Sequence, residues 1–170
     1  AYQGGVFELE GDRATAGERT GVLFTAKGCP HGQCTHCGAR AVYGASLHDV
    51  KSAKRIFEEI KYQHEQYQIS SFLVLDDVFT FNKERLRELA DLIEKWGVKI
   101  KMKVMTRGDL IDDDRAESLR RMGCVSVAIR VESGDQELLN SEIHKNIELE
   151  RVAKTTKTLQ NKGIHVRYYI

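Results

Sequence analysis

Three cysteines in one short segment are the residues best suited to chemistry in this sequence. They lie in Gly28-Cys29-Pro30-His31-Gly32-Gln33-Cys34-Thr35-His36-Cys37-Gly38, with the spacing Cys-x4-Cys-x2-Cys, in a chain that has four cysteines in all. Thiolates held this close repel one another unless a metal ion or cluster lies between them. Metal binding is therefore favoured over free thiols, and a disulfide is the weaker interpretation because cytosolic thiols stay reduced.

Several metals are compatible with this segment. Zinc could take the three cysteines together with His31 or His36. The same spacing matches a 2Fe–2S pattern that needs a distant fourth cysteine, for which Cys124 is the one candidate. Cys29 follows its predicted strand whereas Cys124 begins another, so in a parallel sheet they lie on the order of 20 Å or more apart. We therefore expect Cys124 to be a small buried residue, and the other three cysteines to suit a 4Fe–4S cluster with one open iron.

Apolar segments that alternate with helical patterns must position this loop. Strands are predicted over residues 22–26, 71–75, 98–105, 124–131 and 164–170. Helices are predicted between them, over residues 46–67, 82–97, 112–122, 134–141 and 146–161. Five strands separated by helices predict an α/β fold with a parallel sheet and right-handed crossovers.

Polar residues predict where these helices begin. Ser46-Leu47-His48-Asp49 has the form of a capping box, and the apolar positions after it are Val50, Ala53, Phe57, Ile60 and Tyr67. Asn82 and Asn146 are predicted N-caps, and Gly97 is a predicted C-cap.

Length and charge exclude several classes of protein. The 170 residues suit one domain, which we divide into an N-terminal extended region with a hairpin (residues 1–20) and a core (residues 21–170). With 26 basic and 25 acidic residues, no long-range field recruits nucleic acid or an anionic membrane. No segment holds the roughly 18 apolar residues of a membrane span, and no signal-peptide pattern is present, which predicts a cytoplasmic protein.

The cysteine segment resembles the cluster loop of the radical S-adenosylmethionine (SAM) enzymes. The resemblance continues at the ends of the next three predicted strands, with Leu75-Asp76-Asp77-Val78-Phe79-Thr80, Thr106-Arg107-Gly108-Asp109-Leu110 and Val131-Glu132-Ser133-Gly134-Asp135. These segments are similar to the branch whose members often carry a cobalamin domain, and Lys145 and the helix up to Lys162-Gly163 fit the same pattern. One departure is the cysteine spacing, since the family's usual Cys-x3-Cys-x2-Cys has one residue fewer.

The resemblance implies a partial (β/α) barrel of six parallel strands with its site at the C-terminal ends of the strands. It implies that Cys29, Cys34 and Cys37 ligate three irons of a 4Fe–4S cluster and that SAM chelates the fourth. An electron from a flavodoxin- or ferredoxin-type donor then cleaves SAM to methionine and a 5'-deoxyadenosyl radical, which acts on a substrate that the sequence does not identify. Cobalamin is expected in a separate domain.

The same resemblance implies roles for residues at the strand ends. His36 packs near the adenine, and Asp76 and Asp77 bind the methionine ammonium. Glu132 accepts hydrogen bonds from the ribose or the ammonium, since a lone carboxylate at the end of an apolar strand needs partners. Arg107 or Arg130 pairs with the SAM carboxylate, and outward snorkelling is the alternative for Arg130.

The last predicted strand has no turn signal after it. A parallel strand of this kind should be internal, so we expect the natural polypeptide to continue beyond Ile170 and the 170-residue chain to be truncated in its fifth parallel strand. Self-association through that strand is expected. The alternative to an enzyme is a non-catalytic zinc- or iron-sulfur-binding interaction module with a degenerate cluster loop.

Overall fold

A six-stranded sheet forms the centre of the protein in the computed structural model, which describes residues 2–3, 19–44 and 46–170. The strands follow one another in the order β1 (Tyr2–Gln3), β2 (Arg19–Leu23), β5 (Ser71–Val74), β6 (Lys101–Thr106), β7 (Cys124–Arg130) and β8 (His165–Tyr169). Five strands are parallel, namely β2, β5, β6, β7 and β8, and β1 pairs antiparallel with β2. The predicted α/β fold with an open, partial barrel is confirmed. Of the predicted N-terminal region, residues 1 and 4–18 lie outside the described ranges.

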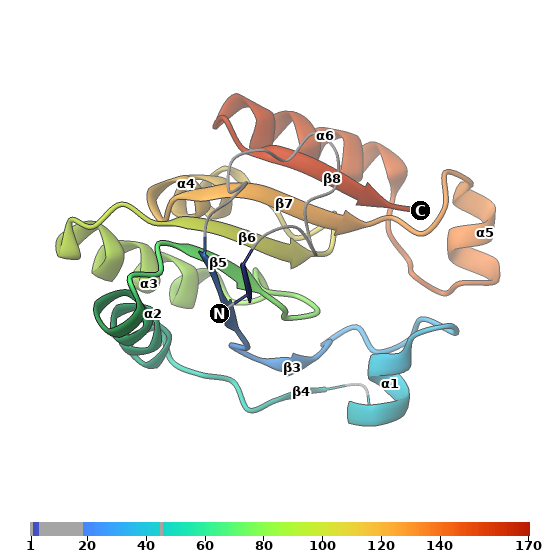
Figure 1. Ribbon diagram of the computed structural model, residues 1–170. Coiled ribbons are helices and arrows are strands. Elements are labelled where there is room, and N and C mark those ends of the chain that lie inside the picture. The colour runs from blue at the N-terminus through green and yellow to red at the C-terminus, as the bar shows by residue number, and fades with distance from the viewer. Residues whose placement is uncertain (1, 4–18, 45) are drawn as a thin grey trace.

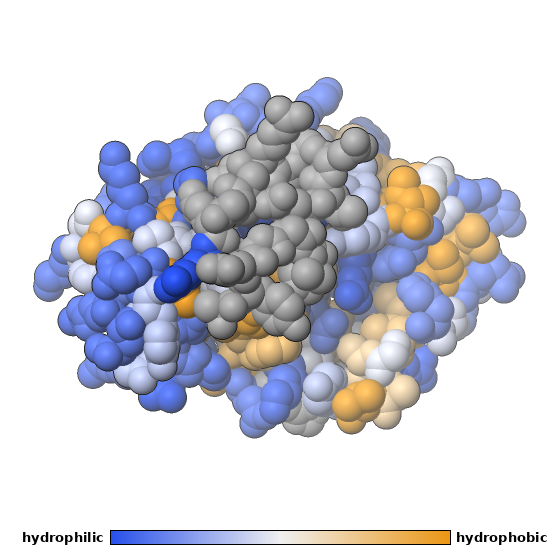
Figure 2. Space-filling model, viewed as in Figure 1, coloured by the Kyte–Doolittle hydropathy of each residue, from blue (hydrophilic) through white to orange (hydrophobic). Residues whose placement is uncertain are grey.

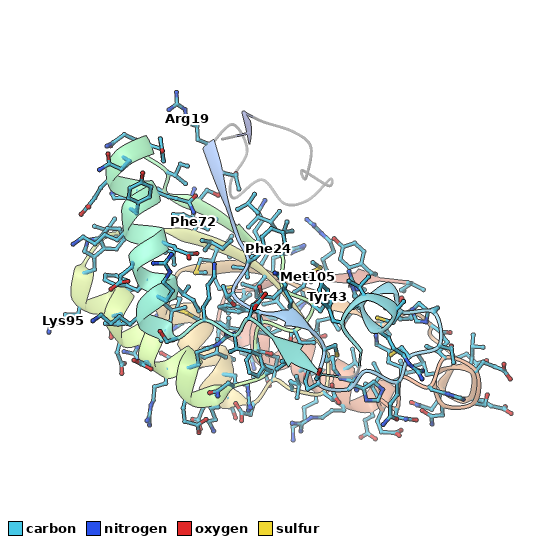
Figure 3. All side chains as sticks on the ribbon, turned by 90° about the horizontal axis from the view of Figure 1, so that it is seen from below. Arg19, Phe24, Tyr43, Phe72, Lys95 and Met105 are labelled. Carbon is cyan, nitrogen blue, oxygen red and sulfur yellow. The ribbon has the colours of Figure 1, made fainter. Side chains whose placement is uncertain are left out.

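Four helices cover one face of this sheet: α2 (Ala53–Tyr67), α3 (Lys83–Trp96), α4 (Asp113–Arg121) and α6 (Leu149–Asn161) (Figure 1). Strand alternation explains the core between them, because Met102, Val104 and Thr106 of β6 are buried while the intervening residues are half-buried. Phe72 of β5 is fully enclosed, whereas Lys95 near the end of α3 extends outward at the periphery (Figure 3).

The helix ends follow the capping chemistry of the sequence in part. Asn82 accepts a hydrogen bond from the Arg85 amide at 2.8 Å and Gly97 ends α3 with a φ of 75°, as predicted. The prediction of a capping box at residues 46–49 is wrong, because residues 47 and 48 form β4 (Leu47–His48) and Ser52 caps α2 instead.

Two further expectations about local structure are wrong. Asn146 does not cap α6, since Glu148 occupies the N-cap position and Asn146 has a φ of 51°. The first strand begins earlier than predicted, at Arg19, and Val22 and Phe24 are exposed on the face of the sheet opposite Leu23. Strand alternation explains the exposure of Val22 and Phe24, because a strand covered on one face by helices turns every second side chain away from them.

The cysteine segment is an excursion between β2 and α2. The short strands β3 (Lys27–Gly28) and β4 pair antiparallel and close its base, and the helix α1 (Gly38–Tyr43) follows the third cysteine. Gly28 has a φ of 83°, and a Cβ atom there would overlap with the carbonyl oxygen of Ser46, so only glycine fits this closure. Both α1 and α5 (Gln136–Ser141) lie beyond the end of the sheet to which the strand arrows point (Figure 1).

The surface around this framework is largely polar. Outside the grey atoms, the face seen in Figure 2 is mostly hydrophilic, with hydrophobic side chains in small separate groups. Among the described residues, no helix has the length and apolar character needed to cross a membrane.

Candidate functional site

The cysteine loop is fastened to a segment more than 100 residues away, the loop after α5. The Thr35 amide donates to the carbonyl oxygen of Ile143 at 3.0 Å, and the Thr35 hydroxyl donates to that of Glu142 at 2.8 Å. The His31 ring lies 2.9 Å, from Nε2, from the carbonyl oxygen of His144. These contacts fix the cysteine loop against residues 142–144.

A cavity of about 480 Å³ opens between this loop and the strand ends. All three cysteines, Cys29, Cys34 and Cys37, line its wall and are half-buried. Five of the six side chains expected at the SAM site also line it, namely His36, Asp77, Arg107, Arg130 and Glu132. The structure therefore brings together residues from the cysteine loop and from the ends of β5, β6 and β7.

Glu132 is the centre of a small ionic network in this cavity. One of its carboxylate oxygens lies 3.3 Å from Nζ of Lys145, and the other lies 3.5 Å from Nε2 of His36. The Glu132 backbone has a φ of 73°, which is uncommon for a residue other than glycine, and its amide donates to the carbonyl oxygen of Tyr169 at 2.9 Å. Backbone strain of this kind is found preferentially at functional sites.

Two arginines face the cavity in different states. Arg107 is 8% exposed and donates two hydrogen bonds, each of 3.0 Å, to the carboxylate of Asp109, so part of its guanidinium is already committed. Arg130 is exposed and lies 3.8 Å from Asp77. Arg130 therefore has the freer guanidinium for an anionic group in the cavity.

Asp76 does not reach the cavity wall. It is 1% exposed, accepts a hydrogen bond of 2.6 Å from the Thr25 amide and a second from the Thr25 hydroxyl, and lies 4.0 Å from the buried guanidinium of Arg85. Burial raises the pKa of Asp76 above its usual value, and the bonds from Thr25 and Ala26 and the charge of Arg85 oppose that rise. Asp76 thus ties β5 to the segment that leads into the cysteine loop.

The three cysteines of the loop line one cavity, and Cys124 does not. Among the described residues, no group of three or more His, Cys, Asp or Glu side chains is placed to hold a metal ion. The three thiols instead stand around one cavity, and iron–sulfur clusters are held by cysteine thiolates around a larger inorganic core. Cys124 is buried at the start of β7, with its Sγ donating to the carbonyl oxygen of Ser126 at 3.4 Å, and does not line this cavity.

Lys145 lines the cavity and has no assigned role from the sequence pattern. Its side chain is 6% exposed, a rare state for lysine, and the Arg107 guanidinium donates to its backbone carbonyl oxygen at 3.1 Å. In the sequence, only the family resemblance of the segment around Lys145 points to this residue. The local periodicity does not distinguish Lys145 from the chain's other lysines.

The family comparison covers most of the chain. Residues 23–170 match the model of the radical SAM superfamily, whose members use a 4Fe–4S cluster and SAM. The sequence is 29% identical over 145 residues to an uncharacterized methyltransferase of Pyrococcus horikoshii, covering 85% of this chain and 31% of that protein. It is 28% identical over 152 residues to the cytidylyl-2-hydroxyethylphosphonate methyltransferase of Streptomyces wedmorensis, covering 89% of this chain and 28% of that protein. The chain therefore spans about a third or less of these relatives.

Solved structures share the fold. The radical SAM methyltransferase TsrM of Kitasatospora setae, solved with cobalamin and a [4Fe–4S] cluster bound, superposes with a TM-score of 0.76 at 18% identity, over 88% of this chain and 30% of that one. Coproporphyrinogen III oxidase of Escherichia coli, a radical SAM enzyme, superposes with a TM-score of 0.61 at 14% identity, over 91% of this chain and 38% of that one. By its matching family model, the chain belongs to the radical SAM superfamily.

Proposed function

We propose that this chain is the cluster- and SAM-binding core of a radical SAM enzyme. One observation carries the proposal: three thiols of one loop share a cavity with cations and carboxylates from the ends of three strands. Such a site at the C-terminal ends of parallel strands is where barrel folds place their chemistry. When bound, the cluster would supply the electron that cleaves SAM to methionine and a 5'-deoxyadenosyl radical, with a flavodoxin- or ferredoxin-type protein as the reductant.

Cys29, Cys34 and Cys37 would hold the cluster. Burial raises the pKa of the Cys34 thiol, and the positive charges of Lys145 and Arg107 act against that rise by favouring the thiolate. Because metal ligation requires the thiolate, those two cations make Cys34 a better ligand.

The other wall of the cavity suits the polar groups of SAM. Asp77 and Glu132 are carboxylates that can accept hydrogen bonds from its ammonium or ribose, and Arg130 or Arg107 can pair with its carboxylate. His36, which is close to Glu132, would lie beside the adenine. Asp76, fully buried on Thr25, would position the β5 end rather than touch the cofactor.

The reaction of the whole protein would be methyl transfer with cobalamin in a separate domain. Both curated relatives are named as methyltransferases, and TsrM was solved with cobalamin bound. The remainder of such a protein would supply the cobalamin and most of the substrate contacts, since the chain spans about a third or less of these relatives.

Anaerobic reconstitution with iron and sulfide tests the core function. We expect about four irons per chain, as a single 4Fe–4S cluster requires, and a paramagnetic signal of the reduced protein that changes when SAM is added. Cys37→Ala should lose the cluster, whereas Cys124→Ala, which removes the thiol that lies away from the cavity, should retain it. Iron would be measured by elemental analysis and the signal by electron paramagnetic resonance.

Two results would contradict the proposal. Tight zinc in place of iron with no SAM binding by calorimetry would identify a non-catalytic metal-binding module. A two-iron cluster that is lost in Cys124→Ala would show that the fourth cysteine is a ligand.

A further inference from the structure

Lys145 places a buried positive charge beside the cysteine loop. Its side chain is 6% exposed and lines the same cavity as the three cysteines. A desolvated ammonium is costly unless it is paired, so its retention here needs a reason.

Glu132 accepts a hydrogen bond from only one of the N–H donors of the Lys145 ammonium group. An ammonium group has three N–H donors, and among the described residues the Lys145 ammonium donates one hydrogen bond, of 3.3 Å, to Glu132. Solvent access is small, and the cavity is the open space next to the group. The remaining donors are therefore available to whatever anionic group occupies the cavity.

The backbone holds Lys145 in this position from both sides. Its amide donates to the carbonyl oxygen of Leu139 at 2.8 Å, and its carbonyl oxygen accepts from the Arg107 guanidinium at 3.1 Å. The flanking residues His144 and Asn146 have φ values of 55° and 51°, a left-handed conformation that costs free energy in residues other than glycine. The same segment anchors Thr35 and His31 of the cysteine loop, so the charge of Lys145 is fixed relative to the thiols.

A fixed charge at this place acts on the reduction of a cluster. Reduction adds one negative charge to a group already bound by thiolates, and a nearby cation stabilises the reduced form more than the oxidised form. Net charge around a cluster and hydrogen bonds to its sulfur atoms are among the factors that set its reduction potential.

We propose that Lys145 tunes the cluster, raising its reduction potential through its charge and its spare N–H donors while it also holds Glu132 in place. This inference rests on the proposed function, because it requires a 4Fe–4S cluster on the three cysteines. It assigns to Lys145 a role distinct from that of a SAM ligand.

Potentiometry of the reconstituted protein without SAM tests this role. In Lys145→Met, which keeps the length of the side chain and removes its charge, the equilibrium constant for one-electron reduction should fall about tenfold, which is a potential lower by 59 mV. Lys145→Arg should restore most of the shift. Lys83→Met serves as the control, because Lys83 pairs with Asp112 and Asp114 between α3 and α4 and does not line the cavity. The cluster of this variant should have the reduction potential of the unmodified protein.

The outcomes separate this inference from the proposed function. Failure of the unmodified protein to take up four irons would overturn both. If Lys145→Met holds a full cluster with the same reduction potential as the unmodified protein, the tuning role alone is overturned. The same holds if that variant also binds SAM more weakly, because Lys145 would then be a SAM ligand. If Lys145→Met does not fold, Lys145→Gln takes its place, because glutamine keeps N–H donors without the charge. Its reduction potential is then compared with that of the unmodified protein.

Discussion

Asp76 and Asp77 are adjacent carboxylates with opposite surroundings. Asp76 is buried against Thr25 and Arg85, while Asp77 lines the cavity 3.8 Å from Arg130. Arg85 itself donates to the carbonyl oxygens of Thr25 and Phe79, at 3.3 and 2.9 Å, and lies over the Phe81 ring. One aspartate therefore belongs to the framework of the site and the other to its wall.

Substitution should separate these two residues. Asp76→Ala leaves the Arg85 guanidinium buried without its carboxylate, and we expect the free energy of unfolding to fall by about 3 kcal/mol. Asp77→Asn should leave that free energy within about 0.5 kcal/mol of the unmodified protein and weaken SAM binding roughly tenfold, because a charge-assisted bond is lost. Chemical denaturation and calorimetry provide the two measurements. Equal loss of stability in both variants would contradict the division.

The sequence could not assign these roles. Two carboxylates at the end of an apolar strand both suggested a binding site, because position relative to a strand end is visible in the sequence while the direction of each side chain is not. That direction depends on Thr25, which is 51 residues away from Asp76. The sequence assigned no role to Lys145 for a similar reason, since its position depends on a distant residue: the guanidinium of Arg107, 38 residues away, donates to its backbone carbonyl oxygen.

Glu117 links two of the covering helices. It accepts hydrogen bonds from Arg120 in α4 and from Lys162 just after α6, the latter at 2.8 Å. These bonds lower the pKa of Glu117 from 4.5 to about 2. Its carboxylate therefore contributes stability that is fully present above pH 4.5 and is lost as the pH falls toward 2.

Glu117→Gln should reduce the loss of stability between pH 5 and pH 2, since the substituted side chain does not titrate. The difference should be small and should shrink in high salt, because the Glu117 side chain is 37% exposed and solvent screens its charge. Thermal unfolding at a series of pH values measures it. The control is Glu88→Gln, an exposed carboxylate of α3 with no ion pair in the described part of the chain, which should leave the acid profile of the unmodified protein intact.

Elements with local signals were predictable. The cap at Asn82, the glycine end at Gly97 and the alternation of strands with helices all depend on nearby residues. The start of α2 was not predictable in this way. Ser46 and Ser52 both suit an N-cap, and the choice between them follows from the pairing of β4 with β3 across the cysteine loop.

β8 is an exposed edge strand of the central sheet. It is the last strand in the described sheet order, and Tyr168, Tyr169 and Ile170 are 43%, 39% and 85% exposed. An uncovered strand edge with apolar side chains is a template for pairing with another chain.

We therefore expect the 170-residue chain to self-associate. Light scattering over a range of protein concentrations should give a molar mass that rises above the 19.3 kDa of one chain. A constant monomer mass at all concentrations would contradict this expectation. An active monomer that cleaves SAM would show in addition that the described strands suffice for the chemistry.

The two attachments of the cysteine loop lie on either side of its second cysteine. His31 and Thr35 are held by the carbonyl oxygens of His144 and Ile143, and Gly32, with a φ of 53°, turns the chain between them. Gln33, between the two attachments, is exposed, and its carbonyl oxygen accepts a hydrogen bond from Arg40 at 3.3 Å. Both attachments accept at backbone oxygens, so substitutions at Ile143 and His144 preserve them, while a deletion there would not. The register of the thiols thus depends on the backbone of residues 142–144 and not on the side chains at those positions.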